Sequence, residues 1–366
     1  MFRKVIFIVV FVILVSAGIV FLIPGERLKI FEDKSMGLQD PTNGPLPSNS
    51  PTATALVSPS TAPLVGENNP QGQIVLMFVG DIMLSRSVGE KMKKENNWNW
   101  PFLNIAETIK KADLLFGNLE GPISDKGANV GSIYSFRADP RVVEGLTFSG
   151  FDVLSVANNH MFDWSRIALE DTLKRLKDSG ISYTGAGLNE KEAHSPTIKE
   201  VQVNDGSKIK IAFLGYCSEG SQYWAATADR SGISWLEENK LKEDIIAAKN
   251  QANILIVSMH SGEEYKTWPN SSQRFFSQLA IDSGADLVIG HHPHVLQPVE
   301  QYKNGYIAFS LGNFVFDQTF SPQTKESVVL KVVVENPSTD SEQVVKIKSV
   351  EQLKAEISND FQVSLK

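Results

Sequence analysis

The sequence of 366 residues contains a single cysteine, Cys217. One thiol excludes an internal disulfide framework and any zinc site built from Cys-x-x-Cys pairs. It also leaves no thiol near the N-terminus that a lipid anchor would require. Cys217 follows the largely apolar run Ile209–Tyr216, so we interpret it as a small buried hydrophobic side chain.

Positive charge is in deficit. The chain has 35 Lys and Arg against 42 Asp and Glu, which gives a net charge of −7 and an isoelectric point near 5.5. A nucleic-acid partner would require a basic face, so we expect none. Small anionic substrates remain compatible with this charge, because bound metal ions supply their own positive charge.

The strongest apolar run lies at the N-terminus. Val5–Ile23 is long enough to cross a membrane as a helix, and Arg3 and Lys4 precede it. A cleaved signal peptide is the alternative, because Val15-Ser16-Ala17 resembles a cleavage site. The run stays apolar up to Ile23, which favours an uncleaved anchor. We therefore predict a cytoplasmic stub and a single transmembrane helix over residues 1–23, with the folded domain outside the cytoplasmic membrane.

A stretch rich in Pro, Ser, Thr and Asn follows the apolar run. Asp40–Gly72 holds seven of the 17 prolines. Such a composition cannot bury enough surface to fold, so we predict a disordered tether over residues 24–72. The folded domain is expected over residues 73–335, and residues 336–366 are expected to form a C-terminal β extension or tail.

Short apolar runs alternate with helical patterns through the domain. This alternation predicts an α/β core, and the β-rich beginning and end indicate sheets flanked by helices in layers. The expected strands are residues 74–79, 114–116, 153–156, 181–183, 208–214, 254–257, 287–289, 306–310, 327–335 and 343–350. The expected helices are residues 87–95, 104–111, 140–148, 167–177, 237–250 and 273–283.

Polar side chains follow several of these strands. Each has an ordinary structural explanation by itself: Asp81 and Glu120 could cap turns, Asn159-His160 could begin a helix, and His260 could be a hydrogen-bonded core residue. The segment His291–His294 changes this assessment, because three imidazoles within four residues after a strand have no packing rationale. We therefore predict a metal site at the carboxyl ends of the strands, for Mn²⁺, Fe or Zn²⁺.

Two divalent ions close together would clamp phosphoryl oxygens and acidify a water molecule for in-line attack. Such a pair needs a bridging carboxylate, for which Glu120 and Asp81 are both candidates. His160 fits the role of an acid that protonates the leaving oxygen, and Asp163 is placed to orient it. Arg86 is a candidate for binding substrate anions, and so is Arg137.

Six segments in order carry a resemblance to a known family: FVGDIML at 78–84, GNLEGPIS at 117–124, ANNHMFD at 157–163, HSGEEY at 260–265, GHHPHVLQPVE at 290–300 and SLGNFVFDQ at 310–318. Together they resemble the CapA family of capsule and poly-γ-glutamate synthesis proteins, a branch similar to the calcineurin-like metallophosphoesterases. The resemblance covers roughly Gln73 to Leu330. It implies a four-layer α/β/β/α metallophosphatase-like sandwich.

The resemblance also implies roles for individual residues. The implied metal ligands are Asp81, Glu120, Asn159, His260, His292 and His294, with His160 as the acid. Further candidates for substrate contacts within the motifs are Asn118, Glu264, His291 and Asn313. The superfamily usually begins with Asp-x-His, and here the third position is Met83, so one ion would lack an imidazole.

The first hypothesis for function is a membrane-anchored, extracytoplasmic, metal-dependent hydrolase-like protein in capsule or poly-γ-glutamate biosynthesis or export. It would hold two divalent ions and act on a phosphoester or an amide of an anionic polymer. The second is a non-catalytic subunit that assembles a membrane polymer synthase with other subunits. A general metallophosphoesterase is a third alternative.

Overall fold

The computed structural model describes residues 14–15, 18–19, 72–204, 206–336 and 345–366. The chain divides into two units, Met1–Ser50 and Pro51–Lys366. In the first unit, strand β1 (Leu14–Val15) pairs antiparallel with β2 (Gly18–Ile19).

The predicted transmembrane helix falls almost entirely outside the described residues. The four positions of β1 and β2 are extended, so the helix expected over residues 1–23 is not confirmed there. Among the described residues, none of the helices has both the length and the apolar character needed to span a bilayer. Apart from Gly72, the predicted tether also lies outside the described residues.

The second unit contains a larger sheet with the order β18-β17-β16-β3-β4-β5-β6, and β15 pairs separately with β3. Strands β3 to β6 run parallel to one another, and β16 to β18 continue the sheet antiparallel. The C-terminal segment thus extends the sheet of the domain. The bounds are β3 (Gln73–Ile82), β4 (Leu114–Leu119), β5 (Val153–Ser155), β6 (Ser182–Thr184), β15 (Asn313–Val315), β16 (Glu326–Glu335), β17 (Lys346–Ile357) and β18 (Val363–Leu365).

A smaller sheet has the order β13-β14-β12-β11-β9-β8. Its four central strands are parallel, and the two edge strands are antiparallel to their neighbours. The bounds are β8 (Thr197–Gln202), β9 (Lys208–Cys217), β11 (Ile254–His260), β12 (Leu287–His291), β13 (Val299–Tyr302) and β14 (Gly305–Ala308). A further short pair joins β7 (Ala186–Gly187) to β10 (Gly232–Ile233).

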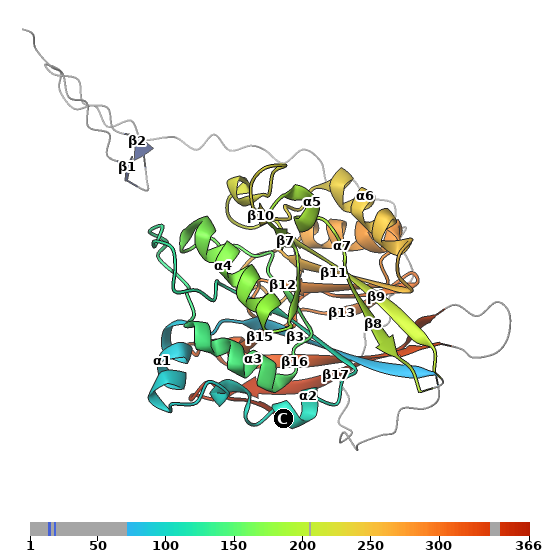
Figure 1. The fold of residues 1–366 in the computed structure, drawn as a ribbon, viewed down its shortest axis with the longest axis horizontal. Coiled ribbons are helices and arrows are strands. Elements are labelled where there is room, and N and C mark those ends of the chain that lie inside the picture. Colours follow the sequence, from blue (N-terminus) through green and yellow to red (C-terminus); the bar gives the residue numbers. More distant parts are fainter. Residues whose placement is uncertain (1–13, 16–17, 20–71, 205, 337–344) are drawn as a thin grey trace, which may run out of the picture. The chain divides into compact units, whose positions relative to one another are not determined.

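Helices cover the outer faces of both sheets (Figure 1). The larger sheet packs against α1 (Arg86–Lys94), α2 (Ala106–Ile109), α3 (Val143–Ser149) and α4 (Ser165–Asp178). The smaller sheet packs against α6 (Glu238–Lys249) and α7 (Ser271–Ser283). The remaining short helices are η1 (Trp100–Phe102), η2 (Pro140–Val142), α5 (Glu190–Ala193), η3 (Gln222–Trp224) and α8 (Pro322–Lys325).

The inner faces of the two sheets share one apolar core. Phe116 of β4 belongs to this core and stacks on Phe213 of β9, with the two ring centroids 5.4 Å apart. The ring centroid of Phe116 is also 5.8 Å from that of Phe78. The layers therefore run helix, sheet, sheet, helix in this unit. Strands buried on both faces, such as β3, need continuous apolar runs, which explains the pattern that predicted them.

The α/β class predicted from the sequence is confirmed, and the differences are local. Strand β3 continues through Asp81 to Ile82, beyond the predicted end at residue 79, because β15 supplies further pairing there. The strand predicted over residues 306–310 joins the smaller sheet as β14, away from β16 and β17. Strands β13, β15 and β18 were not predicted, since three or four residues carry little periodic signal.

The shared core between the sheets should dominate stability. We expect Phe116→Ala to lower the free energy of unfolding of the full-length chain by about 3–5 kcal/mol, because it leaves a cavity between two packed sheets. Phe275→Ala in α7 is the matched control: that ring is 49% exposed, and its loss should cost about 1 kcal/mol or less. Urea unfolding followed by circular dichroism measures both. Equal losses in the two variants would contradict this description of the core.

Candidate metal centre

Strands from both sheets end at one place and deliver polar side chains there. In the larger sheet Asp81 pairs in register with Asn118, and in the smaller sheet His260 pairs with His291. Parallel strands present their carboxyl ends at a common edge, which is why these residues meet. The buried polar residues of this region are Asp81, Asn118, Glu120, Asn158, His160, Asp163, His260, His291, His292, His294 and Asn313.

Two clusters of ligand atoms form at this edge. Asp81, Glu120 and His260 each offer one ligand atom, and these atoms lie within 4.8 Å of one another. Asn118 donates to Asp81 Oδ1 at 2.8 Å, and its amide lies 3.4 Å from His260 Nδ1. Asn159 Oδ1 lies 2.8 Å from His260 Nε2, so Asn159, a fourth predicted ligand, is in contact with this cluster.

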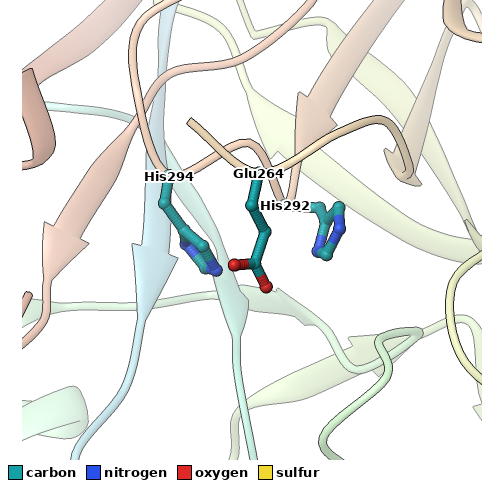
Figure 2. Close-up of side chains that lie close together, drawn as sticks. All are labelled: Glu264, His292 and His294. Atoms are coloured by element: carbon teal, nitrogen blue, oxygen red, sulfur yellow. The ribbon is translucent and has the colours of Figure 1, made fainter. Parts of the chain in front are cut away.

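The second cluster consists of Glu264, His292 and His294, whose ligand atoms also lie within 4.8 Å of one another. Figure 2 shows the Glu264 carboxylate between the two imidazoles. Both histidines are buried, whereas Glu264 is exposed. Glu120 links the clusters, because its Oε1 is 3.6 Å from His294 Nε2. The six predicted metal ligands are thus brought together, with Glu264 added to them.

The side chains of Asn313 and His291 are buried and do not line the cavity described below. Their burial does not fit the substrate contact that we expected of them. Asn313 Oδ1 is 2.9 Å from His294 Nδ1, and Asn313 donates its own amide to Gln318 and to the Thr324 carbonyl. The His291 side chain is fully buried, with Nδ1 3.1 Å from Asp81 Oδ1. Both residues therefore hold side chains of the predicted ligand set, His291 contacting Asp81 and Asn313 contacting His294. Asn118, also predicted to contact substrate, holds Asp81 in the same way.

Burial and close charges shift the acidities of the cluster. Burial by itself would raise the pKa of Asp81, but the contacts of His291 and His294 hold it well below its usual range. Burial opposes the charged form of His294, yet Glu120 and Asp81 outweigh it and raise its pKa to about 9. Burial lowers the pKa of His292 to about 3 and also lowers that of His260, so both imidazoles are neutral, the form that binds metals.

Glu120 is the least satisfied group of the site. Burial is the main cause that raises its pKa well above the usual range. Neither of its carboxylate oxygens has a hydrogen-bond partner among the described residues. An isolated buried carboxylate is costly, so this position requires either a proton or a cation.

His160 stands beside Glu120 on the segment that follows β5. Its Nδ1 is 2.7 Å from Asp163 Oδ2, and its Nε2 is 3.8 Å from Glu120 Oε1. Phe136 stacks on the imidazole at 3.9 Å between ring centroids and donates its backbone N–H to the same Asp163 oxygen. Asp163 and Phe136 thus hold the His160 imidazole in place, while its Nε2 faces Glu120.

A cavity of about 200 Å³ opens next to the clusters. Arg86 lines it together with His160, Glu264, Tyr265 and His294. Arg86 Nε lies 3.2 Å from Asp317 Oδ2, so the predicted anion-binding residue is already paired. Arg137 is not among the residues that line the cavity; its guanidinium stacks over Trp164 at 3.4 Å.

Three residues of the site were not predicted from the sequence. Glu219 Oε2 lies 3.9 Å from His292 Nε2 and its Oε1 accepts from the Gly262 N–H, and its place just after β9 was a usable signal. Asn158 donates to the Leu119 carbonyl and to Asn118 Oδ1. Asp317 pairs with Arg86 from 231 positions away, which no local pattern reveals.

Comparison with known proteins identifies the family of the chain. The profile described as "Bacterial capsule synthesis protein PGA_cap" matches residues 75–318. The "Capsule biosynthesis protein CapA" of Bacillus anthracis is 32% identical over 286 residues, 74% of this chain and 66% of that protein. The "PGA biosynthesis protein CapA" of Bacillus subtilis is 30% identical over 285 residues, 77% of this chain and 73% of that protein. The chain therefore belongs to the family of bacterial capsule synthesis proteins.

Solved structures are less similar. A putative 5′-nucleotidase from Staphylococcus aureus aligns with a TM-score of 0.45 and 17% identity, covering 76% of this chain and 54% of that one. The calcineurin-like phosphoesterase YfkN from Bacillus subtilis aligns with a TM-score of 0.41 and 14% identity, covering 77% and 91%.

The site predicts a specific effect of losing one imidazole. The full-length His292→Ala chain should bind at least one divalent ion fewer than the unaltered chain and remain folded, since it removes a ligand without emptying a hydrophobic core. Plasma mass spectrometry counts the ions, and circular dichroism reports the fold. His194→Gln is the control, because His194 pairs with Asp244 and belongs to neither cluster. Unchanged metal content in His292→Ala would refute the assignment.

Proposed function

We propose that this chain is a metal-dependent hydrolase that takes part in capsule or poly-γ-glutamate synthesis. The observation that carries the proposal is the pair of His and carboxylate clusters that meet at Glu120. The family and the names of the relatives support the biological role. The chemistry rests on the site alone.

The donor set fits two divalent ions. Asp81, Glu120 and His260 would hold one ion, with Asn159 as a further oxygen donor, while His292 and His294 would belong to the other. The unpartnered oxygens of Glu120 and the mixture of imidazole and carboxylate donors suit Mn²⁺, Fe or Zn²⁺. When bound, such a pair supplies positive charge to the oxygens of a scissile group and acidifies a water molecule.

The residues around the clusters would complete the reaction. His160 is placed to deliver a proton from Nε2 to the leaving oxygen or nitrogen, because its Nδ1 is held by Asp163. The cavity beside it has room for one small group of a substrate. Arg86, at the wall of that cavity, would bind an anionic part of the substrate if it exchanged its contact with Asp317.

The substrate would be an anionic polymer or a phosphoester, cleaved at a phosphoester or amide bond. The net charge of −7 argues against nucleic acid. We further propose that residues 1–23 anchor the chain in the cytoplasmic membrane and that residues 24–72 tether the domain outside it. Other subunits of a polymer synthase are the expected partners there.

The proposal is tested by separating proton transfer from metal binding. Full-length chain supplied with Mn²⁺ should hydrolyse a generic aryl phosphodiester, and His160→Gln should lower turnover by about 10²–10⁴-fold with metal content unchanged. Asp163→Asn should lower turnover less, because it disturbs only the orientation of the imidazole. Steady-state rates and metal analysis on the same samples provide both quantities.

Full metal content without turnover on phosphodiesters, phosphomonoesters or glutamyl amides would contradict the hydrolase proposal. The better explanation would then be a non-catalytic subunit that assembles a synthase. Turnover that survives in His160→Gln would remove that residue from the reaction while leaving the metal centre in place.

A further inference from the structure

The second cluster is short of donors if its two imidazoles act alone. A protein site that holds an ion firmly usually offers three or more donors. Met83 lies two residues after Asp81, but its sulfur accepts hydrogen bonds from the Ser85 N–H at 3.2 Å and the Ser85 hydroxyl at 3.0 Å. A thioether also suits softer metals than those a carboxylate-rich site selects. Glu120 Oε1 lies 3.6 Å from His294 Nε2, but Glu120 belongs to the first cluster, so a donor that serves the second ion alone must come from another segment.

We infer that Glu264 is a metal ligand that completes the second ion site together with His292 and His294. This inference rests on the proposed function, since it assigns a role within the same metal centre. Ligand atoms that surround one ion at about 2.1 Å lie up to about 4.2 Å apart. The three atoms already lie within 4.8 Å of one another, so small side-chain movements would close the site.

The backbone holds Glu264 against the imidazoles. Tyr265 donates its N–H to the Pro293 carbonyl at 2.8 Å, and Ser261 donates to the His291 carbonyl at 3.1 Å. The loop that carries Glu264 is therefore tied on both sides to the segment that carries His292 and His294.

Three non-glycine residues of these two segments adopt left-handed backbone conformations, with φ of 63° at Tyr265, 95° at His292 and 58° at His294. Each such residue has an energetic cost, and such costs are concentrated at functional sites. The two segments, joined by these hydrogen bonds, therefore have a defined backbone geometry, which an exposed loop without a functional role would not require.

The local charge favours a ligand role over contact with substrate, which was the role expected for Glu264 from the sequence. A carboxylate at the cavity wall would repel an anionic polymer or phosphoester. Asp81 and Glu120 already make the floor of the site acidic, so a third carboxylate adds to a field that attracts cations. His292 is 6% exposed, and its Nδ1 has no hydrogen-bond partner among the described residues.

The first experiment measures ion binding without any assay of activity. Metal-free full-length chains are titrated with Mn²⁺, and free Mn²⁺ is followed by electron paramagnetic resonance. We expect the unaltered chain to bind two ions, and Glu264→Gln to bind the second at least about tenfold more weakly, the lower end of the loss seen when even a supporting residue is removed. Glu263→Gln is the matched control. The Glu263 carboxylate is next to Glu264 in the sequence but belongs to neither cluster, so this substitution should leave both Mn²⁺ affinities unchanged.

A second experiment separates ligation from mere proximity of charge. In Glu264→Cys, Co²⁺ should produce a thiolate-to-cobalt charge-transfer absorption, which requires a direct bond. Glu263→Cys should show none. The native Cys217 thiol is fully buried, and the unaltered chain with Co²⁺ supplies the baseline spectrum that accounts for it.

The outcomes distinguish this inference from the proposed function. Unaltered affinities in Glu264→Gln, or no charge-transfer band in Glu264→Cys when the chain still binds Co²⁺, would overturn the ligand role and leave the metal centre standing. An unaltered chain that binds no Mn²⁺ would overturn both.

Discussion

The apolar contact between the two sheets brings together the strand ends that carry most side chains of the candidate metal centre. Phe116 packs against Phe213 across this contact and holds β4 over β9. Because both sheets are parallel at their centres, the carboxyl ends of β3 and β4 come to lie beside those of β11 and β12. Asp81 from one sheet and His260 from the other meet as a consequence of this packing.

The main unfavourable free-energy contribution at the site is the burial of charged side chains. Asp81 is compensated by imidazoles, whereas Glu120 has no partner for either oxygen among the described residues. Glu120 and Asp81 raise the pKa of His294 to about 9, and a proton on this imidazole balances part of the buried negative charge.

Close backbone approach makes the arrangement possible. A Cβ on Gly80 would stand 1.9 Å from the Gly312 carbonyl oxygen, so only glycine allows β15 to reach β3 at this point. This approach places Asn313 against His294, and Asn313 in turn is held by Thr324. A residue that never reaches the cavity thereby fixes the orientation of one ligand. Asp163 likewise fixes the orientation of the His160 imidazole through its contact with Nδ1.

The sequence by itself determined the α/β class, most of the longer strands and most of the polar residues that follow them. It could do so because buried parallel strands require continuous apolar runs, and Asp81, Glu120, His260 and the histidines of 291–294 stand directly at the ends of such runs. The three histidines of the last segment were informative without any knowledge of the fold. Only the tertiary structure decided how these residues divide their roles. Contacts between segments far apart in the chain turned His291 and Asn313 inward, brought Glu264 to the imidazoles and paired Arg86 with Asp317, and such contacts leave no periodic trace in a sequence.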